Sequence, residues 1–308
     1  MVICVVGGCG FIGRRVVRQL AGQGHAVVVL DIQTADHFDK LKPAVHVVRA
    51  DITQFEDLVA AFTQYRPDVI INLTYMIGDY PPRAAFKVNV LGLDNCFEAA
   101  RICGVSHVVY TSSNAVYGSG QAPYGERPVH ETDRTMPRKQ YAVHKTFNEW
   151  QAREYREKHG MRVTGIRVAN VAGLDKILGS LDHVQCAVLP ALGEKAVFPY
   201  RDKMRCVIYV DDVADVIARV ATKREPAHDL YNSGGETLSL GDIAEIVRRF
   251  IPEAEIEFEN ETGGRESAEA YILDNSRLVQ EFGISYLPYE RRIAQMIDSV
   301  RRGSTVVT

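Results

Sequence analysis

The sequence predicts an α/β fold: a doubly wound parallel sheet with helices on both faces, accompanied by a smaller C-terminal lobe. Two observations predict the sheet. Short β-rich runs alternate with helical patterns over roughly the first 170 residues, and the strands are continuous apolar runs, typical of a sheet that is buried on both faces. A third observation predicts the lobe, because the alternation stops after that point.

The predicted elements of the first part follow one another in a regular order. The expected strands are Val2–Val6, Ala26–Leu30, Val45–Val48, Val69–Leu73 and Val108–Thr111. Helical patterns occupy Ile12–Leu20, Phe55–Gln64 and a long segment, Ala84–Cys103. Strand–helix alternation of this kind implies parallel pairing with right-handed crossovers.

The second part departs from this order. Val207–Val210 and Leu230–Asn232 are predicted as two further strands of the same sheet, whereas Ala172–Arg205 and Gly234–Thr308 do not continue the alternation. We therefore expect a first domain of residues 1–171, with strands returning at about 206–232. Residues 172–205 and 233–308 are expected to form the smaller lobe.

Composition excludes several classes of function. The net charge of −3 gives no general attraction to nucleic acid or to an anionic membrane. Neither a signal peptide nor a membrane span is expected. The six cysteines include no CxxC pair and lie mostly in apolar segments, which favours reduced thiols in a cytoplasmic protein. No Cys/His cluster has the spacing of metal ligands, so no metal is expected.

The stretch GGCGFIG lies between the first strand and the first helix. Its glycines Gly7, Gly10 and Gly13 stand where a dinucleotide-binding loop needs a tight turn, a close approach to pyrophosphate and close helix–strand packing. The pyrophosphate then lies at the helix N-terminus, where free N–H groups favour an anion. The loop therefore predicts a Rossmann-type cofactor site.

Asp31 ends the second predicted strand, 18 residues after Gly13. A carboxylate at this place accepts hydrogen bonds from the adenosine ribose and repels a 2′-phosphate, so NAD is favoured over NADP. Asp51 and Ile52, after the third strand, are weaker candidates for the adenine edge. Asp51 could equally cap the helix that begins near Phe55.

Two further stretches carry chemistry: VVYTSSNAVYG (108–118) and QYAVHKTFNEW (140–150). Tyr141 and Lys145 are four residues apart and share one face of a helix. A nearby ammonium lowers the pKa of a phenol, which can then act as a general acid and base. Ser113 follows the fifth strand, at the edge where open α/β sheets bind ligands, and its hydroxyl can hold a substrate oxygen.

With these motifs in place, the chain resembles an extended short-chain dehydrogenase/reductase of the NAD-dependent epimerase/dehydratase family, UDP-galactose 4-epimerase-like in type. The resemblance covers nearly the whole chain. It rests on GGCGFIG, VNVLGLDNCFEAAR (88–101), TSSNAVYG, YAVHK, RVANVAG (167–173), MRCVIYVDDVAD (204–215), YNSGGETLSLGDIAEIV (231–247) and GGRES (263–267).

The resemblance implies a set of site residues. Catalysis is assigned to Ser113, Tyr141 and Lys145. NAD contacts are assigned to Gly7, Gly10, Phe11, Ile12, Gly13, Asp31, Asp51, Ile52, Leu73, Thr74, Asn89, Thr111, Tyr141, Lys145, Val168 and Val171. Substrate contacts are assigned to Tyr75, Ser113, Asn114, Asn170, Arg205 and Arg265. The two arginines could clamp a diphosphate, but they could equally form surface or interlobe ion pairs.

The resemblance also implies a reaction. Tyr141 takes the proton of a substrate hydroxyl as hydride leaves the same carbon for NAD, and an epimerase returns the hydride to the other face of the ketone. A nucleotide sugar, such as a UDP-sugar, is the leading substrate. The alternatives are a dehydrogenase of a smaller hydroxylated substrate and a non-catalytic NAD-binding regulator. The dehydrogenase is favoured by the bulky stretch Asn72–Tyr75, where the family has His-Leu-Ala-Ala, and by the short lobe. Family members pair through helices equivalent to Ala84–Cys103 and Tyr141–His159, which implies a homodimer.

Overall fold

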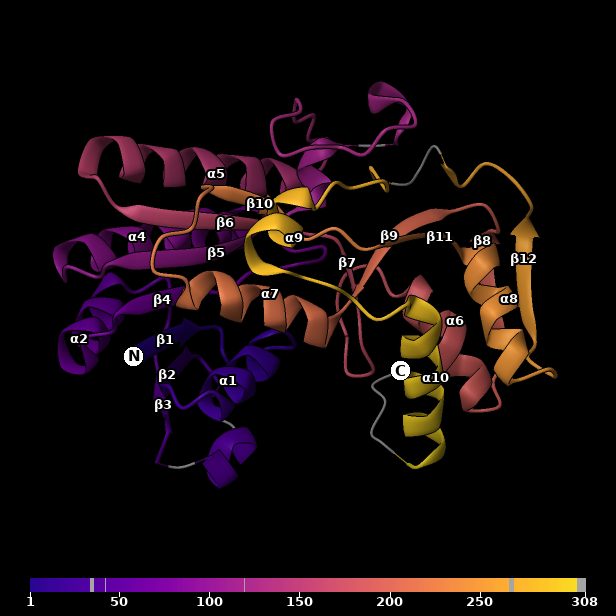
Figure 1. The fold of residues 1–308 in the computed structure, drawn as a ribbon, viewed down its shortest axis with the longest axis horizontal. Helices are drawn as coiled ribbons and strands as arrows, with labels where there is room; N and C mark the ends of the chain where they lie inside the picture. Colours follow the sequence, from indigo (N-terminus) through magenta and orange to yellow (C-terminus); the bar gives the residue numbers. More distant parts are fainter. Residues whose placement is uncertain (34–35, 42, 119, 266–268, 304–308) are drawn as a thin grey trace.

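The computed structural model describes residues 1–33, 36–41, 43–118, 120–265 and 269–303. Its main feature is a seven-stranded parallel sheet with the strand order β10-β6-β5-β4-β1-β2-β3 (Figure 1). The strands are β1 (Val2–Val6), β2 (Ala26–Asp31), β3 (Val45–Arg49), β4 (Val69–Asn72), β5 (His107–Ser113), β6 (Arg162–Val168) and β10 (Leu230–Asn232). The reversal of order at β1 and β4 is that of a doubly wound sheet, so the predicted fold class is confirmed.

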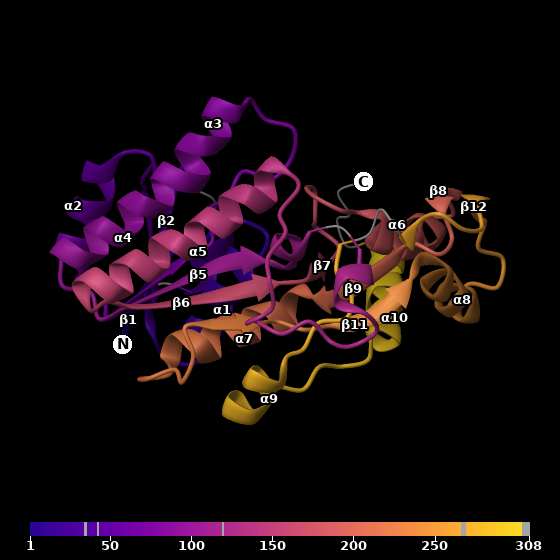
Figure 2. The ribbon, with the colours of Figure 1, turned by 90° about the horizontal axis from the view of Figure 1, so that it is seen from above.

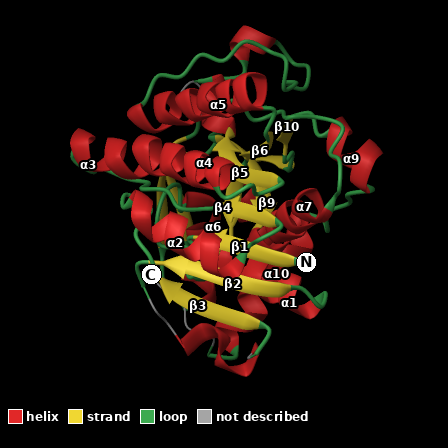
Figure 3. Ribbon diagram, turned by 90° about the vertical axis from the view of Figure 1, so that its left-hand side faces the viewer, coloured by secondary structure: helices red, strands yellow, loops and turns green. Residues whose placement is uncertain are grey.

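Helices cover both faces of this sheet. Figure 3 shows α2 (Phe55–Tyr65), α4 (Gly92–Ile102) and α5 (Gln140–His159) on one face, and α1 (Gly13–Gly22) and α7 (Val210–Thr222) on the other. Two apolar clusters fill the layers: Leu58, Phe62 and Phe97 meet the strands on the first face, and Val16, Leu20 and Ile217 on the second. Because both faces of each central strand are buried, the strands are apolar throughout.

The remaining elements form the smaller lobe. It contains a three-stranded sheet in the order β11-β9-β7 and a two-stranded sheet of β12 and β8. Its strands are β7 (Asn170–Ala172), β8 (Ala196–Tyr200), β9 (Met204–Tyr209), β11 (Glu236–Ser239) and β12 (Ile256–Asn260). Its helices are α6 (Asp182–Ala191), α8 (Leu240–Phe250) and α10 (Tyr289–Arg301), packed around a separate apolar cluster that includes Val184, Ile243 and Met296. The short helix α9 (Ser276–Phe282) lies beside β10 and α7.

One sheet assignment made from the sequence was wrong. Val207–Val210 was expected in the main sheet, but β9 pairs with β7 in parallel and with β11 in antiparallel orientation. Val210 already begins α7. Only β10 returns to the main sheet, where it pairs with β6. The apolar run predicts a strand correctly, but a local pattern carries no information on which sheet supplies the strand's partners.

The predicted long helix Ala84–Cys103 has a more complex form. It begins earlier, as α3 (Pro82–Phe86), widens into a π-helical turn at Lys87–Leu91 and continues as α4. Figure 2 shows α3 and α4 running beside α5. A π-helical turn frees backbone groups from the regular ladder and occurs frequently at functional sites. Asn89 lies within this turn.

Candidate active site

The glycine-rich loop joins β1 to α1 and leaves no room for side chains at two of its glycines. Gly7 has a φ of +80°, and a Cβ there would lie 2.8 Å from the backbone nitrogen of Thr74. A Cβ on Gly13 would collide with the carbonyl oxygen of Gly7 and lie 2.7 Å from the Cα of Gly8. The first turn of α1 contains no acidic residue. This cradle fits a dinucleotide pyrophosphate at a helix N-terminus.

The acidic residues beside the loop have different roles. Asp31, at the end of β2, accepts hydrogen bonds from the backbone N–H of Cys9 (3.0 Å) and of Gln33 (3.1 Å). Its carboxylate therefore borders the loop and keeps further acceptor sites for ribose hydroxyls. Asp51 accepts hydrogen bonds from the backbone and hydroxyl of Thr53 rather than capping α2, whose N-cap residue is Gln54.

Ile52 and the residues after β4 frame the same side of the site. The Ile52 side chain is buried against α4, and its backbone carbonyl oxygen accepts a hydrogen bond from Asn95 at 3.0 Å. Thr74 lies directly against Gly7 and donates its backbone N–H to the side chain of Asn72. Phe11, Ile12 and Leu73 are partly buried and pack against the core, as do the buried Val168 and Val171.

The structure brings Ser113, Tyr141 and Lys145 together. Ser113 ends β5, and the other two residues lie in the first turns of α5. A hydrogen bond with Ser113 lowers the pKa of Tyr141, while burial raises that pKa more strongly, to about 12. Lys145 is buried and donates from Nζ to the carbonyl oxygen of Thr111 at 2.6 Å. The trio is therefore assembled at the carboxyl edge of the sheet.

Lys145 lies closer to Tyr75 than to the ring of Tyr141. Its Nζ is 3.5 Å from the ring centroid of Tyr75 and 5.8 Å from that of Tyr141. Burial lowers the pKa of Lys145 to about 7, with the carboxylate of Glu149 opposing. The side chain is therefore directed to the carbonyl oxygen of Thr111 and the face of Tyr75.

Tyr75 is the most unusual residue of the site. Its ring meets that of Tyr141 edge to face, with centroids 5.3 Å apart, and it covers Lys145. Its hydroxyl is buried and has no hydrogen-bond partner among the described residues, and burial raises its pKa. A buried polar atom without a partner is costly unless something else binds it. This favours Tyr75 as a ligand-binding group.

Asn89 positions the loop after β4. Its side chain accepts a hydrogen bond from the backbone N–H of Met76 (2.7 Å) and donates to the carbonyl oxygen of the same residue (3.1 Å). Its own carbonyl, within the π-helical turn, accepts a hydrogen bond from Asn148 (2.9 Å). Both ends of the Asn89 amide are thus engaged by protein. Sequence reasoning missed Asn148, whose signal was only its position on the face of α5 that carries Lys145.

The predicted substrate residues are spread over several segments. Asn114 is buried and donates to the carbonyl oxygen of Ala270 at 3.4 Å. Asn170 is half-buried at the start of β7. Arg205 is buried on β9 and forms an ion pair with Asp182, whereas Arg265 is exposed. Glu266 and Ser267 of the GGRES motif lie outside the described residues.

Among the described residues, no group of three or more His, Cys, Asp or Glu side chains has an arrangement that could hold a metal ion. Within the same residues, no helix combines the length and apolar character needed to cross a bilayer.

Comparison with known proteins places the chain in a family. Residues 3–234 match the model of the NAD dependent epimerase/dehydratase family. A UDP-glucose 4-epimerase of Mycolicibacterium smegmatis is 31% identical over 269 residues, which cover 80% of this chain and 78% of that protein. The structure of a UDP-glucose 4-epimerase from Thermus thermophilus, in complex with NAD, superposes with a TM-score of 0.84 at 26% identity. It covers 99% of this chain, which in turn covers 100% of that one.

A GalE-like L-threonine dehydrogenase from Cupriavidus necator has the same fold, with a TM-score of 0.83 at 20% identity, covering 97% of this chain and 100% of that one. The family model matches more than half of the chain, and this match establishes that the chain is a member of the family. The chain therefore belongs to the NAD-dependent epimerase/dehydratase family and is an enzyme that uses NAD.

Proposed function

We propose that the chain is a nucleotide-sugar 4-epimerase that acts on a UDP-sugar. The observation that carries the proposal is the assembled site of Ser113, Tyr141 and Lys145 in a chain 31% identical to a UDP-glucose 4-epimerase over most of both lengths. NAD, when bound, supplies a hydride acceptor that can also return the hydride.

The roles of the three side chains follow from their chemistry. Tyr141 removes the proton from the substrate hydroxyl and restores it after the carbon has been reduced on its other face. Ser113 donates a hydrogen bond to the same oxygen. Lys145 binds the nicotinamide ribose and stabilises the phenolate once it turns from Thr111 and Tyr75 toward the cofactor.

The proposed cofactor contacts are those expected from the sequence, with two refinements. Asn89 acts by holding the loop at Met76, and Ile52 contributes through its backbone. We further propose that the cofactor-binding domain comprises residues 1–171 together with α7 and β10. The rest of 172–205 and 233–308, with β9, forms the substrate-binding lobe.

The alternative function is a dehydrogenase of a smaller hydroxylated substrate. Tyr75 fills space beside the catalytic residues, and a GalE-like L-threonine dehydrogenase shares the fold. Incubation with NAD and UDP-glucose separates the two functions. The epimerase converts the sugar with no net reduction of NAD, whereas stoichiometric accumulation of NADH with a simple alcohol, and no sugar conversion, would establish the dehydrogenase.

We also propose a cytoplasmic homodimer. Cys4, Cys96, Cys103, Cys186 and Cys206 form no disulfide bond, as expected in a reducing compartment. Large apolar side chains are exposed on α3, the π-helical turn and α5: Phe86, Leu91, Val143, Phe147 and Trp150. Exposed apolar clusters of this kind mark protein interfaces. Light scattering should give twice the chain mass, and a Phe147→Glu variant should give the monomer mass. A parent that is monomeric at all concentrations would contradict the proposal.

We expect NAD to bind more tightly than NADP. The Asp31 carboxylate borders the glycine loop and would face the 2′-phosphate of NADP, to which it presents a like charge. Fluorescence titration with both cofactors measures the difference. Replacement of Asp31 by Asn should reduce the difference between the affinities for NAD and NADP. Equal affinities of the parent for the two cofactors would contradict this role of Asp31.

The Tyr75→Phe variant should separate stability from substrate binding. Removing a buried hydroxyl without a partner should leave the melting temperature unchanged or raise it. If the hydroxyl binds substrate, KM should rise by roughly tenfold, as for the loss of one hydrogen bond. Thermal denaturation and steady-state kinetics report the two effects. An unchanged KM would exclude the hydroxyl from substrate binding.

A further inference from the structure

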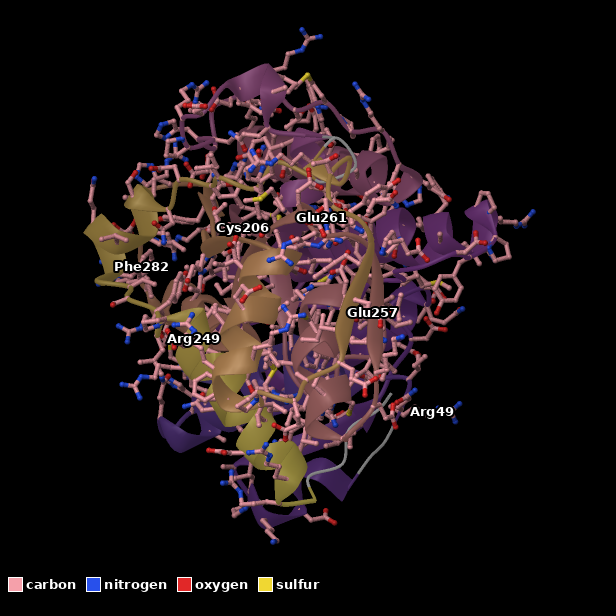
Figure 4. All side chains as sticks on the ribbon, turned by 90° about the vertical axis from the view of Figure 1, so that its right-hand side faces the viewer. Arg49, Cys206, Arg249, Glu257, Glu261 and Phe282 are labelled. Carbon is pink, nitrogen blue, oxygen red and sulfur yellow. The ribbon has the colours of Figure 1, made fainter. Side chains whose placement is uncertain are left out.

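The smaller lobe contains a buried ion pair between Arg205 and Asp182. Arg205 is one of the residues that the sequence suggested for binding a substrate's diphosphate. Arg205, on β9, is 5% exposed. Its Nε donates to Oδ1 of Asp182 at 3.1 Å, and its Nη2 donates to Oδ2 at 2.6 Å. Cys206, labelled in Figure 4, marks the strand that carries Arg205. Two N–H groups of the guanidinium therefore already face a carboxylate.

Asp182 is held in its charged form. It lies in the first turn of α6 and accepts a hydrogen bond from the backbone N–H of His183 at 2.9 Å, and Lys203 lies 3.2 Å from its Oδ2. Burial raises the pKa of Asp182, but hydrogen bonds from His183 and Arg205 and the charge of Arg205 outweigh it and keep that pKa well below its usual range. Burial lowers the pKa of His183 to about 4. At neutral pH the imidazole is thus uncharged, and the carboxylate remains opposite Arg205.

The pair adjoins the chain segment that leads from the catalytic sheet into the lobe. The carbonyl oxygen of Val171, in β7, accepts a hydrogen bond from Nζ of Lys176 (2.7 Å) and lies 3.0 Å from Nε2 of His183. β7 pairs with β9, with Asn170 opposite Val207. Burial lowers the pKa of Lys176 to about 8, with the charges of Asp182 and Glu269 opposing. The charge of Glu269 also adds to the raised pKa of Tyr141, which is caused mainly by burial.

The pairing changes what Arg205 can do. A guanidinium binds phosphate best through two parallel N–H groups, and two of those on Arg205 are committed to Asp182. A diphosphate that approached the remaining edge would also meet the negative charge of Asp182. Lys176 does not replace the arginine, because its ammonium is directed to the carbonyl oxygens of Val171 and Ser180.

We propose that Asp182 is a specificity-determining residue that neutralises Arg205, so that the lobe gains little binding energy from a substrate's diphosphate. The inference rests on the proposed function only in taking a nucleoside diphosphate as the probe. It predicts a substrate that is recognised mainly through groups other than its diphosphate, and it favours the ion-pair interpretation of Arg205 over that of a diphosphate ligand.

Calorimetry on the NAD-loaded protein tests the proposal with UDP and uridine. In the parent, the affinities for the two ligands should differ by less than about tenfold, the fold-change of one charge-assisted hydrogen bond. In Asp182→Asn, UDP affinity should rise by about tenfold or more while uridine affinity stays the same. The double variant Asp182→Asn/Arg205→Met should lose this gain. Glu245→Gln, which removes an exposed carboxylate paired with Arg201 and Arg248 in the same lobe, should behave as the parent.

The outcomes are distinct from those of the epimerase assay. A parent that prefers UDP to uridine by about a hundredfold or more would overturn the proposal without any variant, and it would do so even if Asp182→Asn failed to fold. A gain retained in the double variant would also overturn it. If the parent converts no UDP-sugar but Asp182→Asn gains UDP affinity through Arg205, the proposed function fails and the role of Asp182 stands.

Discussion

A Tyr141→Phe variant should lose turnover by about 10²- to 10⁴-fold, the usual contribution of general acid–base catalysis. The substitution keeps the ring, and therefore the edge-to-face contact with Tyr75, but removes the group that exchanges the proton. NAD affinity should barely change, because the phenol is directed at substrate. Steady-state kinetics and fluorescence titration of NAD measure the two quantities.

A matched control is Tyr65→Phe, which removes a hydroxyl at the end of α2, far along the chain from the catalytic segments. It should retain parental turnover and NAD affinity. Near-parental turnover in Tyr141→Phe would contradict the proposed mechanism and leave only the cofactor-binding fold in place.

A Lys145→Met variant should lose both turnover and NAD affinity, because one ammonium serves the cofactor ribose and the catalytic phenol. Burial raises the pKa of Tyr141 to about 12, so the positive charges of Lys145 and of the nicotinamide have to lower it for the residue to act as a base at neutral pH. Ultraviolet difference titration should show this lowering on NAD binding in the parent and a smaller one in Lys145→Met. In Lys145→Met, the rising limb of the pH–rate profile should therefore shift to higher pH than in the parent.

Stability gives an independent readout of the same lysine. Burial lowers its pKa to about 7 in the folded chain, against about 10.4 in the unfolded one. Between these values the unfolded state binds the additional proton, so this residue makes stability rise with pH across that window. The Lys145→Met variant should lack this rise of stability with pH. Its stability should therefore exceed that of the parent by the largest margin below about pH 7. Lys158→Met, on an exposed part of the same helix, is the control. Parallel stability profiles for parent and Lys145→Met would contradict the buried-ammonium account.

The sequence predicted those parts of the molecule that depend on local pattern. The apolar runs located β1 to β5, and the spacing of Gly7, Gly10 and Gly13 located a loop whose backbone excludes side chains. The four-residue spacing of Tyr141 and Lys145 placed both on one face of α5. These features are encoded by neighbours in the chain, so periodicity and steric requirements suffice to find them.

The features that escaped prediction depend on partners distant in sequence. Strand β9 joined the smaller sheet because its partners are β7 and β11. An ion pair was one of the two interpretations of Arg205, but no sequence pattern identified its partner, Asp182, which lies 23 residues earlier. The position of Tyr75 over Lys145 arises from a loop that Asn89 anchors through Met76. No local pattern signals such contacts, although the departure at Asn72–Tyr75 did indicate an altered site.

The measurement that tests the central claim most directly is the fate of the sugar C4 hydrogen. The NAD-loaded protein is incubated with UDP-glucose in D₂O, and products are followed by NMR. The account predicts formation of UDP-galactose with its C4 hydrogen retained and no net NADH, because the hydride leaves and returns within one site while Tyr141 exchanges only the hydroxyl proton. Deuterium at C4, or oxidation without return of the hydride, would contradict it.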